Sequence, residues 1–225
     1  MDVLKPKTGL TFGTAFEQYE DFYFSPAISL KHENLTTNSK ASDQYEKQKG
    51  TYTDITVPYG LIYDKRNSSY QPKEGFISRF EQEIPLVSNT ASISNTYNLT
   101  KYFSIGDNVI NSVDFFVKAV NSISSKDVRV SKRVNLSGKR LRGFEVGKIG
   151  PTDNDTYVGG NYAASVNFVS QLPNILPTLQ NTDFSFFLDI ANVWGVDYSS
   201  TLDDNGAIRS AIGVGVDWFT PIGPL

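Results

Sequence analysis

The sequence predicts an all-β protein, and more specifically an antiparallel transmembrane β-barrel. Apolar and polar side chains alternate with a period of two in one segment after another, which is the pattern of strands with two different faces. Several of these segments approach the ~10 residues of a barrel strand, whereas strands of soluble sandwiches average about 5–6. Charged residues also stand in mid-strand on the polar faces, which a water-filled lumen tolerates and a dry core does not.

The alternation identifies about nine strands along the chain. In residues 208–219, for example, Ile212, Val214 and Val216 share an apolar face, while Gly213 and Gly215 stand on the opposite face. The predicted strands lie within residues 10–16, 22–30, 54–63, 76–84, 96–103, 112–118, 162–172, 183–190 and 208–219.

The connections between the predicted strands differ in length. Those around residues 87–89 and 106–107 are tight, whereas residues 31–50, 121–160 and 196–207 form long polar connections. Short turns at one end and long loops at the other are typical of outer-membrane barrels, so we expect this division here. The longest connection exceeds the ~12–15 residues of ordinary loops, which indicates that residues 121–160 carry function.

Composition excludes several kinds of site. The formal net charge is -3, from 21 basic and 24 acidic residues, which argues against a nucleic-acid partner. The chain has no cysteine and a single histidine, His32, so thiolate catalysis, disulfides, cysteine-ligated zinc and multi-histidine metal sites are excluded. No apolar run approaches the ~18 residues of a transmembrane helix. We expect neither a metal nor a cofactor.

The two ends of the chain predict a piece of a larger protein. Residues 1–7 lack the apolar stretch of a secretory signal, so export would need a longer precursor. Residues 218–225 read as a strand that runs into a turn with Pro221 and Gly223, where a partner strand would begin. We therefore expect a truncated hairpin at this end and a barrel that is partial.

Four motifs occur in one order along the chain. They are Asp64 and Arg66 in a hairpin; Arg142, Gly143, Phe144, Gly150 and Pro151 in the long loop, followed by Gly159, Gly160 and Asn161; residues 187–194, which include Asp189 and Trp194; and residues 218–225, which include Trp218, Pro221 and Gly223. Together they resemble the outer-membrane assembly factors of the BamA family, part of the bacterial surface antigen superfamily. The resemblance covers essentially the whole chain.

The resemblance implies a fold, a role and partners. The family's barrel has sixteen strands, so residues 1–225 would form an incomplete barrel domain of about nine of them, without polypeptide-transport-associated (POTRA) domains. The loop of residues 121–160 would carry its Arg-Gly-Phe tip back into the lumen. The role would be to fold and insert β-barrel proteins into the outer membrane of a Gram-negative bacterium, without enzymatic catalysis. The partners would be unfolded β-barrel clients, accessory assembly lipoproteins and outer-membrane lipid.

The residues themselves favour one interaction inside the lumen. A buried guanidinium needs a carboxylate, because breaking such a pair costs about 3–5 kcal/mol, and Asp189 stands on the lumenal face by its parity. We predict that Arg142 forms a bidentate pair with Asp189. Gly143 would let the backbone turn tightly, and Phe144 would pack on the inner wall. The resemblance implies a second acidic residue on the strand after the loop, but that face offers Asn167 instead.

Other functions stay open. A TamA-like translocation factor or a two-partner-secretion transporter would share the Arg-Gly-Phe loop, and the number of N-terminal domains would separate them. A passive porin alternates in the same way but gives no reason for an arginine–aspartate pair. An outer-membrane enzyme would have to use Asp189, Glu81 or Glu83 as acid or base, without a converging nucleophile.

Overall fold

The computed structural model describes residues 3–4, 7–37, 43–106, 109–153, 156–173, 182–197, 206–220 and 223–224. Its elements are, in chain order, β1 (Val3–Leu4), β2 (Lys7–Gly13), β3 (Phe16–Tyr19), β4 (Phe22–Thr37), α1 (Asp43–Lys47), β5 (Gly50–Asp64), β6 (Gly75–Ser88), β7 (Ser92–Ile105), β8 (Val109–Ser122), β9 (Thr152–Asp153), β10 (Thr156–Tyr157), β11 (Tyr162–Leu172), β12 (Thr182–Trp194), β13 (Arg209–Thr220) and β14 (Gly223–Pro224). No helix in these ranges is long and apolar enough to cross a membrane.

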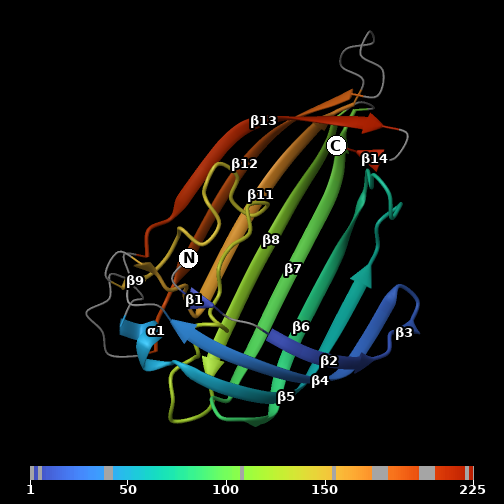
Figure 1. The fold of residues 1–225 in the computed structure, drawn as a ribbon. Helices are drawn as coiled ribbons and strands as arrows, with labels where there is room; N and C mark the ends of the chain where they lie inside the picture. The colour runs from blue at the N-terminus through green and yellow to red at the C-terminus, as the bar shows by residue number, and fades with distance from the viewer. Residues whose placement is uncertain are drawn as a thin grey trace.

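The described strands other than β9 and β10 form one large antiparallel sheet, which confirms the expected all-β fold, and β9 and β10 pair with each other. The order in the large sheet is β1-β4-β5-β6-β7-β8-β11-β12-β13-β14, and β2 and β3 also pair with β4 (Figure 1). Because β1, β2 and β3 share one edge of β4, they together form a single interrupted strand. Each segment that the alternation predicts falls on one crossing of this sheet.

The sheet curls around a hollow. In Figure 1 the strands from β4 to β13 wrap around the chain segment that connects β8 to β11. Within the described residues no pairing joins β13 or β14 to β1, β2 or β3, so the sheet stays open. The connection between β8 and β11, residues 123–161, lies on the concave side, and we call it the lumenal loop.

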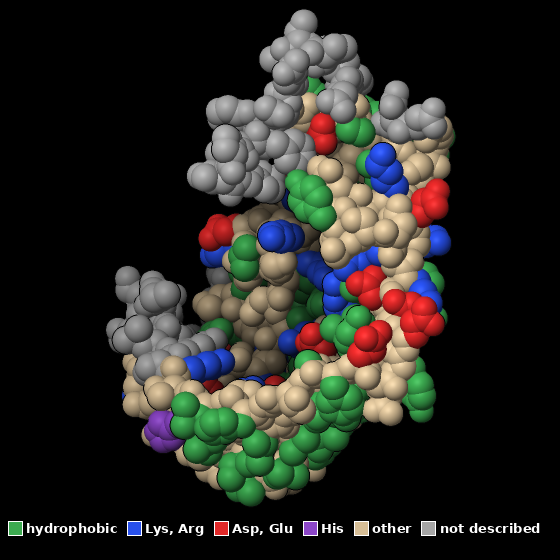
Figure 2. All heavy atoms as spheres, turned by 90° about the vertical axis from the view of Figure 1, so that its right-hand side faces the viewer, with side chains coloured by type: hydrophobic (Ala, Val, Ile, Leu, Met, Phe, Trp, Pro, Cys, Tyr) green, Lys and Arg blue, Asp and Glu red, His purple; other side chains and the backbone are tan. Residues whose placement is uncertain are grey.

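The two faces of the sheet differ as the alternation predicts. Outward side chains are apolar and exposed, as shown by Ile212 at 85% and Val214 at 69% exposure. Inward positions carry polar side chains, and both Asp189 (0%) and Asp54 (2%) are buried. Figure 2 shows hydrophobic side chains gathered over the lower outer surface and charged side chains around the hollow. An apolar outer face and a polar inner face fit hydrocarbon outside and water inside.

The connections do not divide strictly by length between the two ends. The long connections β4–β5, β8–β11 and β12–β13 all lie at one end, which we call the loop end. The tight β6–β7 turn at residues 89–91 also lies at the loop end, so the expected division is wrong for this turn. The reason is topological, since β6 starts at the opposite end and an antiparallel hairpin must reverse where β6 finishes.

The apolar core lies between the lumenal loop and the inner wall. Loop residues Val128, Val134, Leu136, Leu141 and Ile149 pack against wall residues Val120, Ala163, Ala191 and Val193. A second cluster joins loop residues Val130 and Val158 to Leu35 and Tyr45. Because apolar burial contributes about 25 cal/mol per Å², these contacts hold the loop inside the curl in addition to its ion pairs.

Candidate functional site

Three polar side chains form a row across the inner wall. In the strand register Asp114 on β8 lies opposite Asn167 on β11, and Asn167 lies opposite Asp189 on β12. Directly opposed residues of neighbouring strands point to the same face of a sheet, and this face is the lumenal one. The row therefore presents a carboxylate at each end and an amide in the middle to the lumenal loop.

The Arg142 guanidinium lies bidentate on Asp189. Its Nε donates to Oδ2 at 2.8 Å and its Nη2 donates to Oδ1 at 2.6 Å, while the Arg142 backbone N–H donates to Oδ2 at 3.0 Å. The guanidinium carbon also stands 3.6 Å from the ring centroid of Phe187, on the same strand as Asp189. Bidentate pairs between ionised groups are the strong kind of hydrogen bond, so this contact ties the loop tip to β12.

A second loop arginine repeats this arrangement on β8. Arg140 Nη1 contacts Asp114 Oδ1, and its guanidinium carbon lies 4.1 Å from the ring centroid of Phe116. Asp114 also accepts hydrogen bonds from Asn98 at 2.9 Å and Thr100 at 2.8 Å. The second carboxylate under the loop therefore comes from the strand before the loop. Sequence reasoning missed this pair, although the mid-strand position of Asp114 on a polar face was a usable signal.

Asn167 joins the two ion pairs. Its Nδ2 donates to Asp189 Oδ1 at 2.8 Å and to the Arg140 carbonyl at 2.8 Å. An aspartate at this position would lose both donors and would repel the carboxylates of Asp114 and Asp189 across adjacent strands. The Asn167 amide therefore fits between the two acids. The acidic residue that the resemblance implies at this place would not fit there. We call Asp114, Arg140, Arg142, Asn167 and Asp189 the tip site.

Phe144, which we predict to pack on the inner wall, is partly exposed. Its side chain is 37% exposed, whereas Leu141, at 1%, is the apolar residue of the tip that is buried. The aromatic ring that contacts Arg142 comes from the wall, from Phe187. Gly143 has a φ of 81°, in the left-handed region that glycine adopts without strain. The chain turns at Gly143, directly after Arg142, and the partly exposed Phe144 follows this turn.

The loop backbone returns close to the wall at Gly150. This residue has a φ of 102°, and a Cβ there would lie 2.8 Å from Val193 Cγ1. Both the backbone conformation and the lack of space therefore require glycine. The next residue, Pro151, accepts a hydrogen bond on its carbonyl from the Val158 N–H at 3.0 Å.

The motif that follows the loop, Gly159 to Asn161, connects it to β11. Gly159 has a φ of 74°, and Gly160 exchanges two backbone hydrogen bonds with Val134, at 2.7 and 3.1 Å. The Asn161 N–H donates to the Gly195 carbonyl at 2.8 Å. These bonds join the first half of the loop to the ends of β11 and β12.

Two pairs of motif residues lie away from the tip site. Arg66 forms a bidentate pair with Asp64, from Nε to Oδ1 at 2.8 Å and from Nη2 to Oδ2 at 2.7 Å, at the end opposite the loop end. Trp194 lies at the loop end, with its ring centroid 6.0 Å from that of Tyr162. Neither pair contributes to the tip site.

For the motif at the C-terminal end, the structure describes the strand pairing of the backbone. Trp218 pairs with Thr182 in the register of β12 and β13, and Gly223 pairs with Thr220 in a short hairpin with β14. Pro221 lies outside the described residues.

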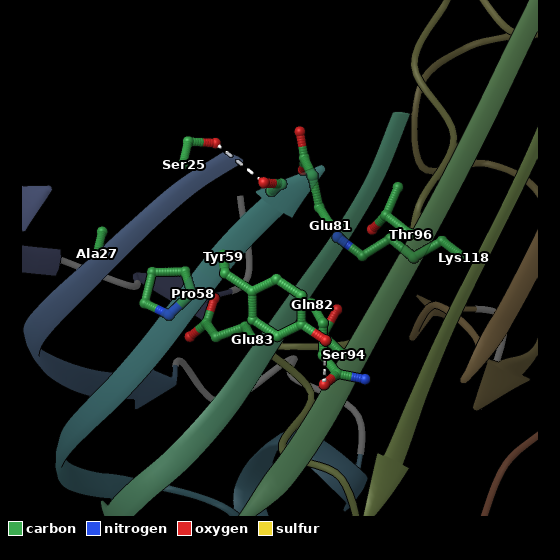
Figure 3. Close-up of a pocket in the computed structure, with 11 residues that line it drawn as sticks. Ser25, Ala27, Pro58, Tyr59, Glu81, Gln82, Glu83, Ser94, Thr96 and Lys118 are labelled. Carbon is green, nitrogen blue, oxygen red and sulfur yellow. Dashed lines mark hydrogen bonds between the residues drawn. The ribbon is translucent and has the colours of Figure 1, made fainter. Parts of the chain in front are cut away.

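The chemistry of the tip site is charge pairing. Asp189 accepts hydrogen bonds from Arg142 and Asn167 on both oxygens, so it is engaged as an acceptor. Glu83, one of the acids considered for an enzyme, pairs with Lys31 at 2.9 Å and lines a lumenal cavity of about 240 Å³ together with Glu81 (Figure 3). In the described ranges, no group of three or more potential ligand side chains gathers to hold a metal ion.

The fold and the tip site together define the class of protein: an outer-membrane β-barrel with a loop folded into its interior. The chain belongs to the Omp85 superfamily, since the model of the Omp85 superfamily domain matches residues 5–225. This superfamily consists of assembly and translocation barrels rather than enzymes.

Individual relatives agree with this assignment. The chain is 27% identical over 191 residues to the outer membrane protein assembly factor BamA of Neorickettsia risticii (strain Illinois), covering 82% of this chain and 26% of that protein. It is 25% identical over 138 residues to the human sorting and assembly machinery component 50 homolog, covering 59% of this chain and 29% of that protein. The chain thus spans little more than a quarter of these relatives' length.

Solved structures show the same fold. BamA from Haemophilus ducreyi lacking POTRA domains 1–3 superposes with a TM-score of 0.84 at 20% identity, over 98% of this chain and 49% of that chain. CdiB from Acinetobacter baumannii superposes with a TM-score of 0.59 at 12% identity, over 96% of this chain and 36% of that chain.

Proposed function

We propose that this chain belongs to the barrel domain of an outer-membrane assembly factor. Such a factor folds and inserts β-barrel proteins into the outer membrane of a Gram-negative bacterium. Two matched relatives carry assembly in their names, and a BamA structure superposes with the higher TM-score of the two solved structures above. The observation that carries the proposal is the tip site, where Arg142 lies bidentate on the buried Asp189. A passive pore gives no reason for such a pair.

The tip site acts as a lock in this proposal. The loop tip is held by ion pairs to β8 and β12 and by the Asn167 amide on β11. A loop held in this way keeps a fixed shape inside the barrel while strands at an open edge exchange partners. The edge of a sheet can template a client strand by main-chain hydrogen bonding, which is the chemistry that barrel assembly requires.

The proposal also covers the protein around this chain. Because the chain spans little more than a quarter of the two matched relatives' length, residues 1–225 would be part of a barrel domain within a longer exported protein of the outer membrane. The partners are unfolded β-barrel clients, accessory assembly lipoproteins and outer-membrane lipid. Because the described strands do not close into a barrel, the purified residues 1–225 should not accelerate folding of a β-barrel client into lipid vesicles.

The experiment that tests the function replaces the protein in its own cells by the Arg142→Met variant. Loss of the guanidinium leaves Asp189 buried and unpaired, so we expect the amount of correctly assembled client barrels to fall several-fold. Assembled barrels are measured by their resistance to unfolding in unheated gel samples. Arg79→Met is the control, because Arg79 is a lumenal arginine on β6 outside the tip site. Normal client assembly in Arg142→Met membranes, at normal variant levels, would refute the proposal.

A translocation barrel is the second candidate. The superposition on CdiB and the shared superfamily support it. A transporter of this type would export a partner polypeptide, so the Arg142→Met variant would lose secretion of that partner while client barrels assemble normally. Channel conductance that is insensitive to Arg142→Ala would instead favour a passive porin.

A further inference from the structure

The first half of the lumenal loop makes a second set of buried contacts, far from the tip site. Arg129 is 2% exposed, and its Nε lies 3.1 Å from Glu33 Oε2 on β4. Its Nη2 contacts Asp54 Oδ2 on β5, and its guanidinium carbon stands 4.3 Å from the ring centroid of Tyr52. One arginine thus joins the loop to two strands that the tip site does not touch.

The two acids of this cluster are buried and are each paired with basic side chains. Glu33 and Asp54 are 4% and 2% exposed, and buried carboxylates are costly unless paired. Lys132 adds a second cation, with Nζ 3.3 Å from Asp54 Oδ2, and Ser131 Oγ donates to Glu33 Oε2 at 2.7 Å. Burial lowers the pKa of Lys132 below the usual lysine value, and the nearby Asp54 opposes this shift. Arg129 therefore lies between the two buried acids, with Lys132 beside Asp54 and Lys7 of β2 at 3.7 Å from Glu33 Oε1.

The same short segment is fixed on its other side to the far wall. The Val128 N–H donates to Asp197 Oδ2 at 2.6 Å, and Arg133 Nη2 lies 3.2 Å from Asp197 Oδ1 in the β12–β13 connection. Val134 exchanges two backbone hydrogen bonds with Gly160 at the start of β11. Residues 128–134, which we call the loop base, therefore contact β4 and β5 on one side and the ends of β11 and β12 on the other.

Between these two attachments the loop base shares an apolar cluster with Val120 of β8 and also faces a cavity. A cavity of about 490 Å³ is lined by Arg129 and Arg133 of the loop base and by Glu83, Ser94 and Lys118 of β6, β7 and β8. The middle strands thus face a polar cavity below the loop base. The attachments join parts of the sheet that are separated by β6, β7 and β8 in the strand order.

We propose that the loop base is a cross-brace that sets the distance between the two walls of the curl, with Arg129 as its positioning residue on the β4–β5 side. The brace is distinct from the tip site, whose two loop arginines pair with β8 and β12. It also stands independently of the proposed function, since its effect is a distance within the protein. Without Arg129 the β4–β5 wall keeps only the contact between Lys132 and Asp54 as an ion pair with the loop base, and its position spreads.

The test measures the width of the curl by electron spin resonance in isolated outer membranes. The chain has no cysteine, so labels are attached at Thr51→Cys on β5 and Ile190→Cys on β12, both exposed positions. We expect Arg129→Met to widen the distribution of label-to-label distances about twofold. The reason is that the state in which the loop base is detached from the β4–β5 wall becomes populated. Arg129→Lys keeps the charge but not the forked geometry, so it should give an intermediate width.

Lys31→Met is the matched control, because it removes a lumenal cation of β4 whose ion pair is with Glu83 on β6. If Arg129→Met does not reach the membrane, Asp54→Asn removes the ion pairs of β5 with Arg129 and Lys132 with an isosteric side chain. The test uses Arg129→Met, or Asp54→Asn in its place. A distance distribution in that variant as narrow as the one in Lys31→Met would overturn the brace. The brace and the proposed function can fail separately. A variant can lose client assembly while its distance distribution is unchanged, or it can keep client assembly while its distance distribution widens.

Discussion

Replacing Asp189 by asparagine should open the tip site with little change in shape. The carboxylate accepts four hydrogen bonds, three from Arg142 and one from Asn167. Asparagine keeps one acceptor oxygen, but its NH₂ group faces N–H donors of Arg142 or Asn167. About two charge-assisted bonds of ~1.5–3 kcal/mol each are therefore lost. The Arg142 side chain is 31% exposed and regains water when released, which offsets part of this loss. We expect a net cost of about 3 kcal/mol, or about 100-fold in the opening equilibrium.

The opening is measured by thiol protection. Ser165 lies on β11, is 2% exposed and stands two positions from Asn167, so Ser165→Cys places the chain's single thiol beneath the loop. Alkylation of this thiol follows the population of the opened state when closing is fast. Asp189→Asn should raise the alkylation rate about 100-fold, and the control Arg79→Met should leave it unchanged. Equal rates in Asp189→Asn and Arg79→Met would refute the claim that the aspartate holds the loop.

Two further substitutions test the surroundings of the tip site. Asn167→Asp creates a row of three carboxylates and removes the donor between them, so we expect about tenfold faster alkylation of the reporter thiol. A slower rate would show that the arginines prefer the extra charge. Gly150→Ala forces a Cβ to within 2.8 Å of Val193 Cγ1 at a φ of 102°, so it should destabilise the barrel by about 1–3 kcal/mol in thermal unfolding. Gly138→Ala, whose Cβ would lie 3.7 Å from Val146, is the control and should be nearly neutral.

Most of the sheet follows from the period-two alternation, because one face meets lipid and the other meets water. The predicted face of Asp189 is lumenal in the structure, and the outward Ile212 and Val214 are exposed as expected. The strands are longer than predicted at several ends, where polar residues continue the pairing without an apolar signal. β4, for example, runs on to Thr37, although the alternation weakens after Leu30.

Loop conformation is harder to predict, because no periodicity fixes it. Phe144 illustrates the difficulty: a large apolar residue in a lumenal loop suggests burial, but Phe144 follows a left-handed glycine and is 37% exposed. Leu141, three positions earlier, is the buried residue. Which of two apolar residues is buried depends on the backbone conformation of the turn, and that conformation follows from the tertiary contacts of the whole loop.

The lumenal aspartates would have been better guides to the loop than its arginines. Asp54, Asp114 and Asp189 each stand in a strand on the polar face, where strand parity alone places them inside the barrel. Each one receives a different arginine of the lumenal loop, namely Arg129, Arg140 or Arg142. A carboxylate on a strand has a fixed direction, whereas a loop arginine can reach many places. Strand parity therefore predicts which wall carboxylates need a cation from the loop. The conformation of the loop decides which arginine supplies it.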